Sequence, residues 1–113
     1  MRITNARVVE HTFLDGMLGD GYYPDHLVAK GQAILRRLCA RIEADRPGDL
    51  DALYALTHAA TERFNELQDE FFEAGSEIET VARDAIATDF FFVADAYGFK
   101  DADIEELVAT RDW

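Results

Sequence analysis

The side chains best suited to chemistry lie in the second half of the chain, at His58, Glu62 and Asp89. His58 and Glu62 are four residues apart, so on a helix they occupy neighbouring surface. There they could act as a general base with its orienting carboxylate, or bind a metal. The HExxH and ExxH motifs do not occur, and a single cysteine cannot build a thiolate site. We therefore expect no metal and no other cofactor.

Asp89 is the residue whose position is hardest to explain. Helical spacing places it near the middle of an apolar face formed by Ile78, Val81, Ala82, Ala85, Phe92, Val93 and Ala96. An isolated buried carboxylate is costly, so it needs a partner, a proton or a cavity. We expect a structural partner, either Arg37 or Arg41, or else His58. The alternative is a small-molecule or metal-dependent enzyme whose site joins His58, Glu62 and Asp89.

Three basic side chains border an apolar stripe earlier in the chain. Lys30, Arg37 and Arg41 are seven and then four residues apart, so they lie along one edge of the same helix. They either extend over apolar surface and pair with acidic neighbours, or form an anion pocket. In that pocket Arg37 and Arg41 would be the forked donors.

For the remaining reactive side chains we expect ordinary structural roles. His11 and His26 lie near carboxylates but complete no ligand spacing, so we expect surface or loop residues. Cys39 lies among apolar residues of a helical pattern, which predicts a buried thiol. A single cysteine allows no intrachain disulfide, which favours a reducing compartment and a cytoplasmic protein.

The charge of the chain is strongly negative and unevenly distributed. The net charge is −12, which disfavours contact with phosphate backbones, so we expect no nucleic-acid partner. Residues 1–48 carry a net +1 and residues 49–113 a net −13. The acidic half is either a solvated surface or one that steers a basic partner. No segment approaches the roughly 18 apolar residues of a membrane span, so we expect no membrane insertion.

A central helix from Asp49 to Phe72 organises the predicted fold. At about 1.5 Å per residue it is roughly 35 Å long, so it must cross a domain of this size. Its core-facing stripe consists of Leu50, Leu53, Leu56, Thr57, Ala60, Phe64, Leu67 and Phe71. Beside the stripe lies a half-polar shoulder, expected to be half buried, made of Tyr54, His58, Thr61 and Asn65.

Four further helices are predicted around this one. The first runs from the N-cap Asn5 to about Leu18, and the second from Pro24 to about Asp45. Gly75 ends the central helix, and Ser76-Glu77-Ile78-Glu79 reads as a capping box that opens the fourth. That helix ends at Tyr97-Gly98, and a short last helix starts near Asp101. The chain, residues 1–113, is thus predicted to be one all-α domain, an antiparallel four-helix bundle with a short C-terminal helix.

Three segments carry a resemblance to a known family. LYALTHAATERFNELQ, GSEIETVARDAIATDF and YGFKDADIEELVATRDW resemble a small bacterial family known as a domain of unknown function. The resemblance covers nearly the whole chain, including YYPDHLVAKG. It implies a bacterial single-domain protein and brings no catalytic or binding residue with it.

The functional hypothesis that follows is a non-enzymatic interaction module. It would bind a protein partner, whether basic or not, through acidic second-half residues such as Glu66, Asp69 and Glu70, as a regulator or an immunity-type inhibitor does. Phe91, inside the run Phe90-Phe91-Phe92, points away from the main stripe. Either the first helix or the C-terminal segment covers it, or it forms the contact of a homodimer.

Overall fold

The computed structural model describes residues 2–113 and consists of helices joined by short connections. These are α1 (Ala6–Glu10), the 3-10 turn η1 (Asp15–Met17), α2 (Asp25–Asp45), α3 (Leu50–Glu73), α4 (Thr80–Ala96) and α5 (Ile104–Leu107). The prediction of an all-α bundle is confirmed. Within residues 2–113, no helix combines the length and apolar character needed to cross a membrane.

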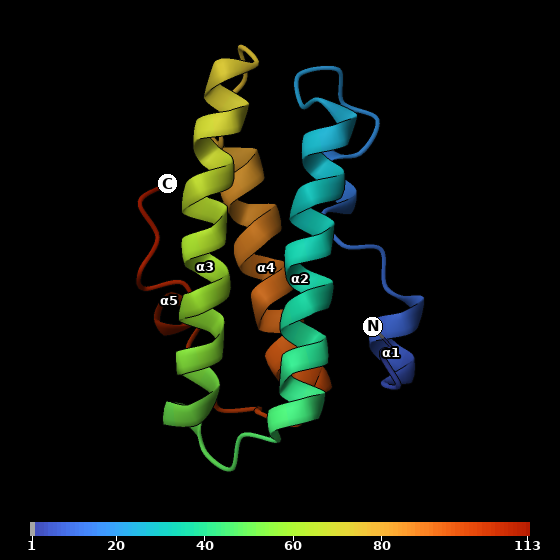
Figure 1. Ribbon diagram of the computed structural model, residues 1–113, viewed down its shortest axis with the longest axis vertical. Coiled ribbons are helices and arrows are strands. Elements are labelled where there is room, and N and C mark those ends of the chain that lie inside the picture. Colours follow the sequence, from blue (N-terminus) through green and yellow to red (C-terminus); the bar gives the residue numbers. More distant parts are fainter. Residues whose placement is uncertain (1) are drawn as a thin grey trace.

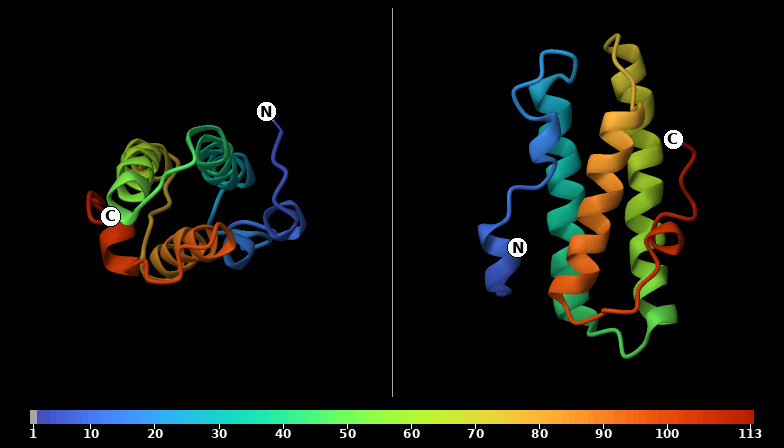
Figure 2. Two further views of the ribbon diagram at one scale, coloured as in Figure 1. Left: turned by 90° about the horizontal axis from the view of Figure 1, so that it is seen from below. Right: turned by 180° about the vertical axis from the view of Figure 1, so that it is seen from behind.

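Three long helices form the body of the bundle, and the chain as a whole measures 41 × 27 × 20 Å. α3 runs antiparallel to both α2 and α4, and the three helices form a triangle when viewed end on (Figures 1 and 2). The segment with α1 and η1 lies beside the α2–α4 side of the triangle. α5 and the C-terminal residues lie beside the α3–α4 side. The α2–α3 side faces the viewer in Figure 1 and has no segment over it.

The periodicity of α2 and α3 accounts for the core between them. Of the predicted stripe of α3, Leu53, Thr57, Ala60, Phe64, Leu67 and Phe71 are buried, whereas Leu50 and Leu56 are half buried. α2 buries Leu27, Val28, Gly31, Leu35, Leu38, Cys39 and Ile42. The start of α3 is as predicted, because the Asp49 side chain accepts a hydrogen bond from the Ala52 amide at 2.9 Å.

The first helix is shorter than predicted. Asn5 caps it as expected, since its side chain accepts from the amides of Arg7 and Val8, but α1 ends at Glu10 and not near Leu18. His11 is already extended, and Leu14 has the left-handed φ of 57°. The chain leaves the helix there because His11 and Leu14 are held by α4, as described below.

Leu14 then packs closely on α2 at a glycine. A Cβ atom on Gly31 would lie 2.7 Å from Cδ1 of Leu14 and 3.2 Å from Cε1 of Phe64. The missing side chain therefore lets the 11–14 loop approach α2 directly.

The turn between α3 and α4 does not contain the predicted capping box. Gly75 does end α3, with φ of +81°, but Ser76 is not the N-cap of α4. The Ser76 amide donates to the carbonyl of Phe71 at 2.9 Å, which closes a Schellman motif at the end of α3. α4 begins four residues later, at Thr80, with Glu79 as its N-cap. Ser76, which was expected to start α4, thus belongs to the end of α3.

The buried face of α4 is rotated relative to the predicted one. Ala82, Ile86, Asp89, Phe90, Val93 and Ala94 are buried, whereas Val81 is 52% exposed. Phe91 is 40% exposed, so neither the first helix nor the C-terminal segment covers it as expected. The rotation arises because α4 packs against η1 on one side and α5 on the other. The end of α4 at Gly98, with φ of +89°, and a short helix α5 are as predicted.

Candidate functional site

The polar shoulder of α3 binds the C-terminal segment. Nε2 of His58 donates to the carbonyl of Glu106 at 2.7 Å, and the Thr61 hydroxyl lies 3.3 Å from the carbonyl of Leu107. Asn65 donates to the Thr110 carbonyl and accepts from the Asp112 amide, both at 3.0 Å. Tyr54, His58 and Asn65 are half buried, as predicted, whereas Thr61 is fully buried. Its side chains hold α5 and the chain end against α3.

The predicted general-base pair of His58 and Glu62 does not form. His58 has its second contact, at 3.5 Å, with the carboxylate of Glu106, whereas Glu62 is exposed. No hydrogen bond or ion pair of the described residues joins His58 to Glu62 or to Asp89. Within residues 2–113, no group of three His, Cys, Asp or Glu side chains is placed to hold a metal ion. His58, Glu62 and Asp89 therefore do not share a site.

Asp89 is buried, as predicted, but its expected partners were wrong. Its side chain is on the core side of α4, with 7% of the residue exposed. Oδ1 lies 2.9 Å from Nε2 of His11, and Oδ2 accepts from the backbone amide of Leu14 at 2.6 Å. Neither Arg37, Arg41 nor His58 contacts it, because α4 meets the 11–14 loop at this level and not the polar edges of α2 or α3.

His11 is correspondingly more than a surface residue. Its ring stacks on Phe92, with ring centroids 3.9 Å apart and planes 16° from parallel, and meets Phe13 edge to face. Together with Asp89 it fixes the left-handed turn at Leu14. We call Asp89, His11 and the Leu14 amide the Asp89 clasp. His26, by contrast, is exposed on α2, as expected.

Glu43 of α2 fastens the N-terminal residues in a similar way. Its carboxylate accepts hydrogen bonds from the amide and hydroxyl of Thr4, the amide of Asn5 and the hydroxyl of Tyr97. Burial by itself raises the pKa of Glu43, but these donors outweigh it and lower the pKa from 4.5 to about 2. Glu43 is thus a second structural carboxylate, one that helical periodicity gave no reason to single out.

A groove lies along the α2–α3 side of the bundle. Its upper part, about 220 Å³, is lined by Lys30, Ala33, Ile34, Arg37, Arg63, Glu66, Leu67 and Glu70. Its lower part, about 330 Å³, is lined by Ile34, Arg37, Leu38, Arg41, Ala55, Leu56, Ala59, Ala60 and Arg63. The two parts share Ile34, Arg37 and Arg63, so they are one continuous feature, which we call the α2–α3 groove.

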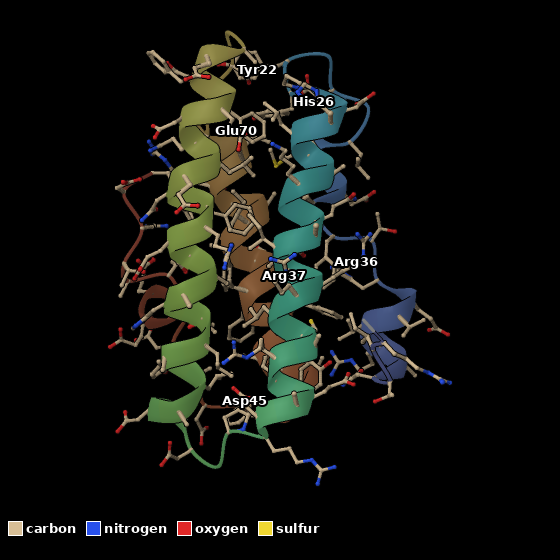
Figure 3. All side chains as sticks on the ribbon, viewed as in Figure 1. Tyr22, His26, Arg36, Arg37, Asp45 and Glu70 are labelled. Atoms are coloured by element: carbon tan, nitrogen blue, oxygen red, sulfur yellow. The ribbon has the colours of Figure 1, made fainter. Side chains whose placement is uncertain are left out.

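The predicted border of basic residues on α2 does line this groove, and α3 adds a further arginine. Arg37 lies on the front of α2, where the groove opens, and Arg36 lies on the side toward α1 (Figure 3). Arg41 pairs with Asp45 at 3.0 Å, but among the described residues Arg37 and Arg63 have no ion-pair partner. The geometry therefore leaves two guanidinium groups available to an anion over a mainly apolar floor.

A second surface lies where α3 ends and α4 begins. Phe72 is 70% exposed there, in a hollow lined by Gln68, Asp69, Phe72, Glu77, Ile78 and Arg83. We call these six residues the Phe72 surface. An aromatic side chain left in water beside carboxylates has the character of a protein-contact site.

The predicted interface residues are divided among different surfaces. Asp69 belongs to the Phe72 surface, whereas Glu66 and Glu70 line the upper groove, where Glu70 pairs with Lys30. Phe91 lies on the outer face of α4. A homodimer contact at Phe91 stays a prediction.

Sequence pattern alone did not single out Arg63, Phe72 or Glu43, and it did not identify His11 as the partner of Asp89. Phe72 follows the core residue Phe71, so at about 100° per residue it points away from the stripe, and this signal was present in the sequence. Arg63 likewise precedes the core residue Phe64, which places it on a flank of α3. Which flank faces α2 depends on how the helices pair. The contact of His11 with Asp89 spans 78 residues and follows from no local pattern.

Comparison with known proteins gives a family and no activity. A family model described as "Family of unknown function (DUF5713)" matches residues 7–113. No curated protein and no solved structure matches the chain significantly. The matched range contains both the α2–α3 groove and the Phe72 surface.

Proposed function

The chain belongs to the DUF5713 family of unknown function, and we propose that it is a non-enzymatic module that binds a protein partner through its acidic second half. The contact we propose is the Phe72 surface, and the partner is basic. The observation that carries the proposal is the exposure of Phe72 between Asp69 and Glu77. The role we propose for this module is that of a regulator or an immunity-type inhibitor.

The physical argument combines an apolar anchor with charge. Transferring a phenylalanine side chain from water to an interface contributes about 2 kcal/mol, and central aromatic residues dominate many interfaces. The carboxylates around Phe72 belong to the half of the chain with a net charge of −13. Charges at the rim of an interface steer a partner of opposite sign and set its orientation.

The engagement of the reactive side chains supports a binding role over catalysis. His58 holds α5, and Asp89 and His11 hold the Leu14 turn. Each of these groups has a structural partner. No observation favours the alternative enzyme built on His58, Glu62 and Asp89.

The compartment we propose is the cytoplasm, on the evidence of the thiol. Cys39 is free and fully buried in α2, and burial raises its pKa to about 12, so the thiol stays protonated and unreactive. A free cysteine that forms no disulfide is typical of proteins in a reducing compartment.

The test is affinity capture from a lysate of the source cells with matched variants as bait. The wild-type chain is expected to retain a specific partner at low salt and to release it at high salt, because exposed charges are screened over about 10 Å or less at physiological ionic strength. Phe72→Ser is expected to abolish capture. Val9→Ser is the control, because Val9 is equally apolar, 63% exposed and located on α1.

Two outcomes would reject the proposal. One is capture of no partner by the wild-type chain at either salt concentration. The other is a partner retained equally by wild type, Phe72→Ser and Val9→Ser, which would locate the contact elsewhere. Circular dichroism of each bait confirms that it is folded, so that a lost contact is not mistaken for an unfolded chain.

A further inference from the structure

The α2–α3 groove lies on the one side of the three-helix body that no other segment of the described residues covers (Figure 2). The α2–α4 side receives the 11–17 segment, in which the Phe13 carbonyl accepts from Gln32 of α2 at 2.9 Å. The α3–α4 side receives α5, whose Leu107 is fully buried. Over α2 and α3 the views show no further chain (Figures 1 and 2).

The side chains that line the groove favour an occupant with negative charge. Arg37, Arg41 and Arg63, three of the eleven basic residues of the chain, line its lower part, and no acidic side chain does. In a chain with a net charge of −12, this is a local reversal of sign. An arginine that lies over apolar surface and lacks a carboxylate partner favours an anion that also brings apolar groups.

The shape of the groove determines the kind of occupant. It is open to solvent and extends along α2 from Lys30 to Arg41, which is roughly 16 Å at about 1.5 Å per residue. Its floor is formed by Ile34, Leu38 and Leu56, and the small residues Ala33, Ala55 and Ala59 leave room for close approach of another backbone. An enclosed pocket would surround a small molecule, whereas a long groove that is open to solvent between two helices fits a third helix.

The chain itself contains an example of such an occupant. The segment Asp103–Val108, which covers the α3–α4 side, buries Leu107 and Val108 and exposes the acidic residues Glu105 and Glu106. Only Ile104–Leu107 of this segment is helical, a single turn with its carboxylates exposed and Leu107 buried. From the arginines and the apolar lining of the groove we infer that the α2–α3 groove binds an acidic amphipathic helix of a protein partner.

In this arrangement the apolar stripe of the partner helix lies on Ile34 and Leu56. Its carboxylates pair with Arg37 and Arg63, whose forked donors can bind both oxygens of one carboxylate. The lower part of the groove is the favoured end, because Glu66 and Glu70 line the upper part and repel acidic side chains. The site is separate from the Phe72 surface, and neither proposal depends on the other.

The experiment uses the full chain and two synthetic helical peptides. Both carry leucines at positions i, i+4, i+7 and i+11; one has glutamates and the other has lysines at the flanking positions. Binding is measured by fluorescence anisotropy of the labelled peptide. The glutamate peptide is expected to bind more weakly as salt increases, and the lysine peptide is expected not to bind.

Two neighbouring arginines provide the matched variants. Arg37→Glu is expected to weaken binding of the glutamate peptide about tenfold or more, because it places a repulsive charge in the groove. Arg36→Glu makes the same change of charge one residue away, on the side of α2 that faces α1, and is expected to change binding less than about threefold. Ala59→Trp, which fills the groove without changing charge, is expected to block binding.

Several results would overturn the inference. Equal binding of both peptides, equal effects of Arg36→Glu and Arg37→Glu, or no binding at all would each do so. Binding of decanoate at the groove without binding of the glutamate peptide would identify a small-molecule site instead. A dimer seen by light scattering and dissociated by Arg37→Glu would make a second copy of this chain the occupant, which also contradicts a foreign helix.

Discussion

The Asp89 clasp and the α2–α3 groove place charged side chains on apolar surface in opposite ways. Asp89 is buried, and both of its oxygens have partners inside the chain. Arg37 and Arg63 are exposed, and no ion pair among the described residues involves them. Asp89, whose position in the sequence was hardest to explain, therefore fastens the 11–14 loop to α4. Arg37, one of the two predicted donors of an anion pocket, and Arg63, which the sequence pattern did not single out, are the groups free to bind a ligand.

The energetics of the two regions differ for the same reason. Removing one partner of a buried charged contact leaves the other polar groups without a hydrogen bond and costs several kcal/mol. Removing an exposed charge without a partner changes the free energy of unfolding little. Mutations at the two regions should thus separate cleanly into effects on stability and effects on binding.

The largest effect is expected at the clasp itself. Asp89→Ala removes both acceptors and leaves the Leu14 amide and His11 unpaired, so it should lower the free energy of unfolding by about 2 to 4 kcal/mol. Asp89→Asn keeps one acceptor and should cost about half as much. Asp84→Ala is the control, because Asp84 is exposed on the same helix. Urea denaturation measures all three variants.

A stability of Asp89→Ala equal to that of Asp84→Ala would contradict the structural role of the Asp89 clasp. In that case the burial of Asp89 would call for another explanation, such as a ligand. The contrast with the groove would then disappear.

A smaller and pH-dependent effect is expected at Glu43. Its pKa is lowered from 4.5 to about 2, so its carboxylate stabilises the folded state fully above about pH 4.5 and loses that contribution as the pH falls toward 2. Glu43→Gln should therefore cost about 1 to 2 kcal/mol at neutral pH, and the difference from wild type should shrink on acidification. Urea denaturation at about six pH values between pH 2 and pH 7 measures this difference.

The control for Glu43 is Glu10→Gln, because Glu10 is exposed at the end of α1. Its difference from wild type should stay near zero over the same pH range. A Glu43 difference that grows on acidification would have the wrong sign and would show that the hydrogen bonds from Thr4 and Tyr97 do not govern the titration of Glu43.

Much of the fold follows from local pattern, and the errors have physical causes. The spacing of apolar residues placed α2 and α3 within a residue or two, because the core-facing stripe of a long helix repeats along its whole length. The first helix was extended too far because its early end depends on contacts of His11 and Leu14 with α4. Ser76 is predicted to start α4 but instead ends α3, because its amide donates to the carbonyl of Phe71. A serine after the glycine at a helix end fits either role.

The candidate sites show the same division. Helical spacing correctly turned Asp89 inward and put Arg37 and Arg41 at the border of the core. It could not identify His11 as the partner of Asp89, because that choice depends on which elements pack together. It could not reveal the α2–α3 groove either, because a groove exists only where other segments leave two helices uncovered.

The smallest effect is expected in the groove and sharpens the contrast with the clasp. Arg37→Gln and Arg63→Gln should each change the free energy of unfolding by less than about 0.5 kcal/mol, because each removes an exposed charge without an ion-pair partner and keeps most of the apolar stem. Urea denaturation at neutral pH is again the measurement, with Arg36→Gln as the control of equal charge. A loss above about 1 kcal/mol at Arg37 or Arg63 alone would mean that the guanidinium group is bound within the fold. It would then not be free for a partner, and the proposed role of the groove would lose its basis.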